Sequence, residues 1–164
     1  MAKVSNKVNK SIKKEAVFKR LSENRYAKFQ YEILETIEAG IELLGTEVKS
    51  IRNGNANLRD GYCSFRDGEI LLLNVHISPH KNVGSFFNHD PLRNKKLLLH
   101  KKEIIKLKSN TEKKGLTIIP LSIYLKGSWI KVTIGIGKGK KLHDKRQADK
   151  QKDIKREIKT ALKR

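Results

Sequence analysis

The uneven distribution of charge along the chain is the feature that most constrains its fold. Residues 1–28 carry nine Lys and Arg against two Asp and Glu, and residues 138–164 carry twelve against four. The segment 29–137 is nearly balanced, with sixteen basic and eleven acidic residues. Because like charges repel one another in a compact state, the folded core is expected in this central segment. The sequence therefore predicts one folded body with a basic arm at each end.

The overall charge indicates the class of partner. The 164 residues carry a formal net charge of +20. Nucleic acid is the usual partner of such a chain, and an anionic membrane surface is the main alternative. No apolar run of about 18 residues predicts a transmembrane helix, and the N-terminus lacks the apolar stretch of a signal peptide. The single cysteine, Cys63, excludes an intramolecular disulfide and is typical of a reducing cytoplasm.

The pattern of the central segment predicts mainly strands. Residues 31–44 alternate loosely between apolar and polar, and we interpret them as two paired strands around Ala39-Gly40. Asp67-Gly68 separates the runs 62–65 and 69–77 and predicts a hairpin. Residues 116–136 are rich in β-branched side chains and predict two further strands, joined at residues 126–128.

Two helices are expected beside these strands. Residues 46–53 place Val48 and Ile51 three apart and end at Gly54. Residues 90–107 predict a second helix that begins near Pro91. The expected fold is mainly β with flanking helices (α+β), a small OB-like antiparallel β-barrel over residues 24–137. Residues 1–23 are then a basic, flexible N-terminal arm, and 138–164 form a basic C-terminal tail.

The C-terminal tail has a thin apolar stripe among its lysines. Ile154, Ile158, Ala161 and Leu162 lie on one side of a helix. The tail is too charged to be a stable helix alone, so we expect it to be disordered when free and helical when bound to a polyanion. A solubilising extension is one alternative, and a membrane-surface helix is another, although the stripe lacks aromatic residues.

Residues for catalysis or metal binding are sparse. His76 and His80 have i, i+4 spacing, but Pro79 lies between them, so surface or RNA-facing side chains are favoured over a zinc site. His89-Asp90 resembles part of a nuclease site, yet His-Asp before proline more often caps a helix. The glycines at 135–139 lack the spacing of a phosphate-binding loop. The sequence therefore predicts no catalytic residues, no metal, no cofactor and no enzyme activity.

A series of short motifs resembles one known family. The motifs are, in order, 31–33 (YEI), 38–41 (EAGI), 44–52 (LGTEVKSIR), 56–58 (ANL), 66–69 (RDGE), 74–79 (NVHISP), 89–91 (HDP) with Arg93, 96–100 (KLLLH), 115–121 (GLTIIPL) and 137–146 (GKGKKLHDKR). From residue 24 to 146 the chain resembles the SmpB family, the SsrA-binding proteins of bacterial trans-translation. Residues 1–23 carry no such resemblance.

This resemblance implies a fold and an activity. The family has an OB-like barrel with flanking helices and acts as an adaptor without being an enzyme. It binds the tRNA-like domain of transfer-messenger RNA (tmRNA, SsrA) and delivers it to stalled 70S ribosomes for rescue and peptide tagging. The protein body replaces the missing anticodon arm, and the tail enters the empty mRNA channel near the decoding centre. Elongation factor Tu and alanyl-tRNA synthetase act on the same RNA. The implied location is the cytoplasm, with no membrane partner.

The resemblance also implies the RNA-contacting residues. Glu38, Leu98 and His100 match the family's contacts on the barrel. The Glu38 carboxylate would accept hydrogen bonds from base amino groups or orient a neighbouring Lys or Arg. His100 would stack on a base or donate to phosphate, and Leu98 would pack on a base face, with ordinary core packing as its alternative. The predicted RNA-binding set also contains Asn24, Lys49 and Arg52.

A second set of residues is implied for the ribosome. It consists of tail residues that match the family motif: Lys138, Gly139, Lys140, Lys141, Asp144, Lys145 and Arg146. The basic members would contact 16S rRNA phosphates, and Asp144 would orient a basic neighbour. Two positions depart from the family pattern. Phe29 stands where histidine is frequent. Gly137 stands where alanine is common, and because of this glycine we expect a looser joint before the tail.

Two other functions remain open on sequence alone. A structural ribosomal protein, or a general basic RNA-binding barrel, has the same charge pattern and tail. An RNA-processing nuclease is the third hypothesis, with His89 as the residue to test.

Overall fold

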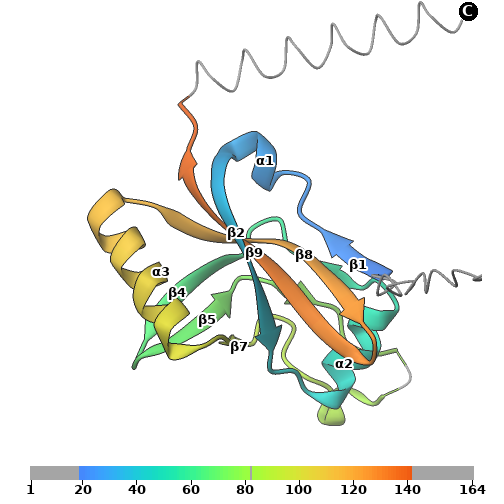
Figure 1. Cartoon of the computed structure of the whole chain (residues 1–164). Coiled ribbons are helices and arrows are strands. Elements are labelled where there is room, and N and C mark those ends of the chain that lie inside the picture. Colours follow the sequence, from blue (N-terminus) through green and yellow to red (C-terminus); the bar gives the residue numbers. More distant parts are fainter. Residues whose placement is uncertain (1–18, 82, 142–164) are drawn as a thin grey trace, which may run out of the picture.

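One antiparallel sheet organises the protein in the computed structural model, which describes residues 19–81 and 83–141 (Figure 1). Its strands are β1 (Lys19–Glu23), β2 (Tyr31–Ile41), β4 (Tyr62–Arg66), β5 (Glu69–Leu73), β7 (Lys95–Leu98), β8 (Thr117–Lys126) and β9 (Trp129–Gly139). A separate pair is formed by β3 (Ala56–Asn57) and β6 (His76–Ile77). The helices are α1 (Ala27–Gln30), α2 (Gly45–Arg52), α3 (Lys101–Lys114) and the 3-10 turn η1 (Ser85–Phe87). The prediction of a mainly β fold with few helices is confirmed.

The strand pairings close into a cycle. β9 pairs with β2, β2 with β7, β7 with β5, β5 with β4, β4 with β8, and β8 again with β9. The link between β4 and β8 is the narrowest, with the single pair Cys63 and Ile118. β1 adds to β8 from outside the cycle. A closed cycle leaves few unpaired backbone groups at strand edges.

Local turn residues fix the hairpins as the sequence predicts. Asp67 and Gly68 have φ of 52° and 78° and connect β4 to β5. Gly127 has φ of 61° and connects β8 to β9. Glycine reaches this left-handed region without steric cost, so each turn is specified locally. α2 also forms where its apolar spacing predicts a helix, and it ends before Gly54, whose φ is 78°.

An aliphatic core fills the inside of the cycle. Every strand from β4 to β9 contributes side chains to it, and α2 and α3 cover it with one residue each. Its fully buried members include Ile51, Ile70, Leu72, Ile77, Leu97, Leu107, Ile118, Ile123, Val132 and Ile134. Burial of such side chains is the main stabilising term of a small domain. Cys63 belongs to this core, and burial raises the pKa of its thiol.

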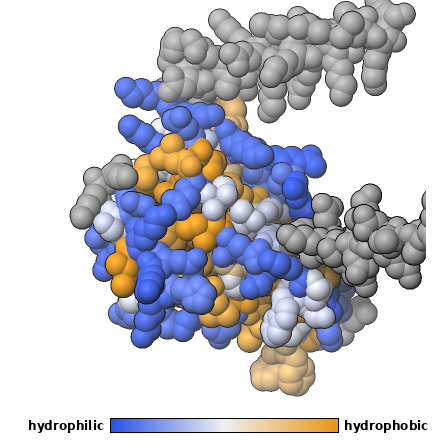
Figure 2. All heavy atoms as spheres, viewed as in Figure 1, coloured by the Kyte–Doolittle hydropathy of each residue, from blue (hydrophilic) through white to orange (hydrophobic). Residues whose placement is uncertain are grey.

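The surface seen in Figure 2 is mostly hydrophilic. Hydrophobic atoms gather near the centre of that face and in a protrusion at its lower edge. The most exposed aromatic rings among the described residues are Phe86 and Phe87 of η1, at 91% and 77%. Within those same residues, no helix is long and apolar enough to cross a membrane.

The predicted helix over residues 90–107 is wrong in its first half. Asp90 and Arg93 form a turn, with the backbone N–H of Leu92 donating to Asp90 Oδ1 at 2.9 Å. Residues 95–98 are strand β7, and α3 begins only at Lys101. β7 is paired with β2 on one side and with β5 on the other. This pairing between distant segments outweighs the local helical spacing.

Three other expectations about boundaries are also wrong. Residues 31–41 form one long strand rather than two paired strands, with a register shift between Ile33 and Glu35. Residues 19–23, expected in the flexible arm, form β1 on the edge of β8. β9 continues through Gly139, so the folded body extends beyond residue 137. The rest of the arm and the tail from residue 142 lie outside the described residues.

A buried ionic network holds the turn before β7 against α2. Arg93 donates to both oxygens of the fully buried Glu47, at 3.1 and 2.7 Å, and the N–H of Leu44 donates to the same carboxylate at 2.7 Å. Burial raises the pKa of Glu47, but these hydrogen bonds outweigh burial and hold the pKa below its usual value. Lys95 is also fully buried, and its ammonium donates to the Val75 carbonyl at 2.7 Å.

Candidate nucleic-acid interface

Three of the predicted RNA-contacting residues meet at one hollow on the outer face of the sheet. Glu38 lies on β2, Leu98 ends β7, and His100 immediately precedes α3. The hollow has a volume of about 410 Å³. Its lining is completed by Gly40, Leu99, Glu103 and Lys131.

The floor of this hollow depends on a close approach between β2 and β7. Gly40 is the register partner of Leu98, and a Cβ at Gly40 would lie 3.0 Å from the Cβ of Leu98. Leu98 is 52% exposed, so core packing does not account for it. An exposed leucine beside a polar hollow can pack against the face of an unpaired base.

Glu38 is held as an ionised acceptor. The hydroxyl of Tyr124 donates to Oε2 of Glu38, and the Lys126 ammonium donates to Oε1 and Oε2 at 3.0 and 3.1 Å. These contacts, first that of Tyr124 and then that of Lys126, hold the pKa of the Glu38 carboxyl below its usual value. Burial, together with the hydrogen bond to Glu38, raises the pKa of Tyr124 to about 12. Glu38 thus contacts a lysine, and its contact with RNA remains a prediction.

His100 is positioned by the start of α3. Its backbone N–H donates to Glu103 Oε2 at 2.9 Å, and its carbonyl accepts from the N–H of Glu103 at the same distance. This reciprocal arrangement fixes the first turn of the helix. The His100 side chain is exposed at the rim of the hollow.

A second hollow of about 330 Å³ lies on the other side of Glu38. It is lined by Arg20, Glu38, Ser122, Tyr124 and Thr133. No sequence motif indicates Arg20, Tyr124 or Lys126 at this site. They come from β1 and β8, and only the strand register brings them beside Glu38.

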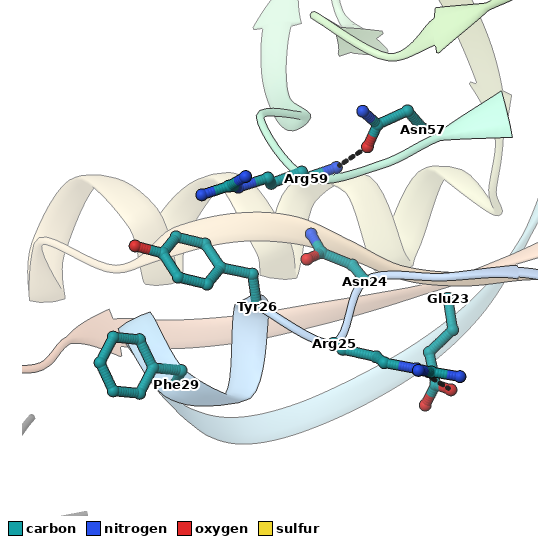
Figure 3. Close-up of a pocket in the computed structure, with 7 residues that line it drawn as sticks. All are labelled: Glu23, Asn24, Arg25, Tyr26, Phe29, Asn57 and Arg59. Atoms are coloured by element: carbon teal, nitrogen blue, oxygen red, sulfur yellow. Dashed lines mark hydrogen bonds and ion pairs between the residues drawn. The ribbon is translucent and has the colours of Figure 1, made fainter. Parts of the chain in front are cut away.

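A larger groove of about 560 Å³ lies at α1 and is shown in Figure 3. The guanidinium of Arg59 lies 4.7 Å from the centre of the Tyr26 ring, and the Tyr26 and Phe29 rings are 5.5 Å apart with a tilt of 32°. Flat cationic and aromatic groups of this kind bind unpaired bases by stacking. The i, i+3 spacing of Tyr26 and Phe29 could have indicated the aromatic pair. No pattern of neighbouring residues in the sequence indicates that Arg59 joins this aromatic pair.

Asn24 lines this groove but is only 4% exposed. Its side-chain amide donates to the carbonyls of Leu58 and Pro120, at 2.8 and 3.1 Å, and its Oδ1 accepts from the N–H of Ala27 at 3.0 Å. Both amide N–H groups are therefore used to hold α1 to the body. The predicted contact of Asn24 with RNA remains a prediction.

Lys49 and Arg52 lie apart from the Glu38 hollow. Both are on α2, which packs against β1 and β6, and neither is buried. Neither residue lines the hollows that contain Glu38. Their contact with RNA also remains a prediction.

The first predicted tail residues belong to the body. Lys138 and Gly139 are the last residues of β9, and the Lys140 N–H donates to the Gln30 carbonyl at 2.9 Å. The expected looser joint at Gly137 is wrong, because Gly137 is buried and a Cβ there would lie 2.6 Å from the carbonyl oxygen of Glu32. Lys141 is exposed at the end of the described chain. Asp144, Lys145 and Arg146 lie outside it.

His89 has a structural role inside the folded body. It is buried, with Nδ1 2.9 Å from Thr46 Oγ1 and Nε2 3.1 Å from the Ile77 carbonyl oxygen. A carbonyl only accepts, so Nε2 carries the hydrogen and Nδ1 accepts from the threonine hydroxyl. His89 links α2 to β6 and caps no helix. Across residues 19–81 and 83–141, no group of three or more His, Cys, Asp or Glu is placed to hold a metal ion.

Comparisons with known proteins identify the family. The model of the family described as "SmpB protein" matches residues 21–164. An SsrA-binding protein of Prochlorococcus marinus strain MIT 9515 is 94% identical over all of this chain and 99% of its own length. Another, of strain MIT 9211, is 65% identical over 99% of this chain and 97% of its own length.

A solved structure gives the same result. It is described as "tmRNA-SmpB: a journey to the center of the bacterial ribosome" and is 50% identical in sequence, with a TM-score of 0.62. The match covers 73% of this chain and 84% of that one. The motif series, the fold and these relatives agree, and the chain belongs to the SmpB protein family.

Proposed function

We propose that this protein is an RNA-binding adaptor that binds the tRNA-like domain of tmRNA and delivers it to stalled ribosomes for trans-translation. The observation that carries the proposal is the hollow formed by Glu38, Leu98 and His100. Glu38 is distant in the sequence from Leu98 and His100, and the three residues lie together on one exposed surface. The surface offers an ionised acceptor, an exposed apolar side chain and an imidazole, the groups that read unpaired bases.

The closed cycle of strand pairings supports a finer description of the fold. We infer that it is an OB-like barrel, because six strands pair in a ring around one aliphatic core. Such barrels present a curved outer face and loops to nucleic acid. In this protein the outer faces of β2 and β7 carry the proposed contacts.

We further propose that the α1 groove and the basic tail meet the ribosome. The Lys140 ammonium donates to the Lys28 carbonyl at 3.0 Å, so the tail leaves the body beside α1. A tail in the mRNA channel would therefore bring the stacked groups of Arg59, Tyr26 and Phe29 close to 16S rRNA. That RNA would be contacted, chiefly through its phosphates, by the tail residues 138–141 and 144–146. Elongation factor Tu and alanyl-tRNA synthetase would act through the shared tmRNA.

The proposed activity is binding without catalysis, in the cytoplasm and without a cofactor. A structural ribosomal protein is the second candidate, since the basic ends suit either function. The arrangement at Glu38 favours the adaptor, because a carboxylate held on an exposed face suits base recognition better than general phosphate binding.

The test is a titration of the full chain against the tRNA-like domain of tmRNA at physiological salt, with alanine tRNA as competitor. The adaptor predicts binding that alanine tRNA does not displace. Displacement by any RNA to the same extent would leave a general basic RNA-binding protein. The substitutions Glu38→Gln and His100→Ala are expected to weaken the specific complex by tenfold or more, at about 1–3 kcal/mol for each lost base contact.

A further inference from the structure

One row of cross-strand neighbours runs over five strands, from β1 to β7. In it Arg20 pairs with Tyr124, Tyr124 with Lys131, Lys131 with Gly40, and Gly40 with Leu98. Directly opposed residues of neighbouring strands point to the same side of a sheet. Strands lie about 4.8 Å apart, so the row spans about 19 Å.

The row faces outward. The alternate positions of three of these strands, Ala39, Ile123 and Val132, are fully buried in the core. Leu98 at one end of the row is half exposed, and the side chain of Arg20 at the other end is 64% exposed. Gly40 contributes no side chain, which leaves the Glu38 hollow open toward Lys131.

Two cations on this row are available for anionic partners. Lys131 takes part in none of the ion pairs found among the described residues, although its charge helps to lower the pKa of Glu38. Arg20 pairs with Glu23 at 3.1 Å, and both side chains are partly exposed to water. Such surface pairs contribute little free energy, so Arg20 can exchange its carboxylate for a phosphate at small cost.

Glu38 connects the two hollows along this row. It lines the hollow with His100 and Lys131, and also the one with Arg20 and Tyr124. We infer that the RNA-binding surface continues from Leu98 across β9 and β8 to β1, with Lys131 and Arg20 as phosphate ligands. Tyr124 is a positioning residue that orients Glu38 between the two hollows. This inference rests on the proposed function and extends it to residues outside the family motifs.

RNA fits the row better than an apolar protein surface does. The side chains around Glu38 in the second hollow are hydroxyls, a phenol and a guanidinium, and none is aliphatic. The row spans about 19 Å, and its two cations lie on different strands, so they can contact separate phosphates of one RNA backbone. Phosphate contacts at Arg20 and Lys131 would fix the register in which the RNA presents its bases to Glu38 and His100.

The test measures salt dependence in the full chain. Arg20→Gln, Lys131→Gln and the double variant are titrated with the tRNA-like domain of tmRNA over a range of salt concentrations. Each lost phosphate contact is expected to reduce the slope of log K against log salt by about 0.7 to 0.9, and the double variant by about twice that. Arg66→Gln is the matched control, because Arg66 is an exposed arginine in the β4–β5 turn, 3.6 Å from Asp67. It should leave the slope unchanged.

The outcomes separate this inference from the proposed function. If Arg20→Gln and Lys131→Gln keep the original slope while Glu38→Gln loses binding, the RNA does not cross the row and the inference is overturned. An equal fall for Arg66→Gln would also overturn it, since the effect would then be one of net charge. If the unaltered chain does not prefer the tRNA-like domain over alanine tRNA, the proposed function itself fails.

Discussion

The hydroxyl of Tyr124 on β8 donates a hydrogen bond to the carboxylate of Glu38 on β2, across the intervening strand β9. Neither residue is isolated, since Lys126 donates to the same carboxylate. The three side chains keep a negative charge at a fixed place on a strongly basic protein. A fixed acceptor among cations can choose between bases, which a uniformly positive surface does not do.

Replacement of Tyr124 by phenylalanine tests this positioning. The variant removes the largest cause of the lowered Glu38 pKa, so that pKa is expected to rise toward the ordinary value of 4.5. An NMR titration of the Glu38 side-chain carboxyl carbon measures the change directly. Tyr31→Phe is a control tyrosine outside both Glu38 hollows. The tRNA-like domain should also bind less selectively to Tyr124→Phe, whereas an unchanged Glu38 pKa would show that Lys126 alone holds the charge.

The ion pair of the buried Glu47 with the partly exposed Arg93 predicts a measurable effect on stability. Glu47→Gln leaves the partly exposed Arg93 without its ionised partner, and we expect the free energy of unfolding to fall by about 1–3 kcal/mol. Chemical denaturation at pH 7 measures this loss. Glu69→Gln, which breaks an exposed pair with Lys96, should change stability far less than Glu47→Gln does. Equal effects of the two substitutions would contradict the role of the buried network.

The same pair predicts the direction of a pH effect. The pKa of Glu47 is lower in the folded protein than the ordinary 4.5. The stability that this carboxylate contributes is therefore present above about pH 4.5 and is lost as the pH falls through the folded pKa. The Glu47→Gln variant should lack that part of the acid-induced loss when unfolding is measured between neutral and acidic pH.

Gly40 predicts a separation between RNA binding and folding. In Gly40→Ala the new Cβ would lie 3.0 Å from that of Leu98, so the leucine must shift by a few tenths of an ångström at the hollow. We expect the affinity for the tRNA-like domain to fall several-fold while the protein stays folded. Gly84→Ala is the control, because nothing lies within 4 Å of its Cβ position. A binding titration combined with thermal unfolding decides between a displaced contact and a general loss of structure.

The parts of the fold that were predictable from the sequence are those that depend on neighbouring residues. Asp67-Gly68 and Gly127 specify their turns whatever the rest of the chain does, and both hairpins are confirmed. Lys95–Leu98 has a helix-like context but becomes a strand, because β2 and β5 supply partners on its two sides. The deciding interactions come from distant segments that no local pattern contains.

The residues of the candidate site also fall into those that the sequence indicates and those that only the fold brings together. Glu38, Leu98 and His100 were recognisable because they lie in family motifs, and the structure brings all three to one hollow. Tyr124 and Arg20 reach Glu38 only through strand register, so no spacing along the chain indicates them. Arg59 likewise reaches Tyr26 from a loop more than thirty positions away.

The α1 groove predicts a defect that RNA binding alone does not reveal. Tyr26→Ala removes the ring that lies between Arg59 and Phe29. We expect near-normal affinity for the isolated tRNA-like domain, because the groove is separate from both Glu38 hollows, but reduced peptide tagging on stalled ribosomes. A parallel loss of both activities would place the groove in the tmRNA interface instead.

Truncation of the tail gives the sharpest separation of the two proposed surfaces, provided that the cut respects the fold. Deletion of residues 142–164 leaves β9 and the Lys140 anchor intact, so stability and binding to the tRNA-like domain should persist while peptide tagging is lost. Deletion of 138–164 also removes the pairs of Lys138 with Glu32 and of Gly139 with Tyr31. This longer deletion should lower the unfolding temperature as well. For both truncations we would measure RNA affinity, unfolding temperature and peptide tagging, which assigns each function to its segment. Equal loss of RNA affinity and tagging in the shorter deletion would show that the tail belongs to the tmRNA-binding surface.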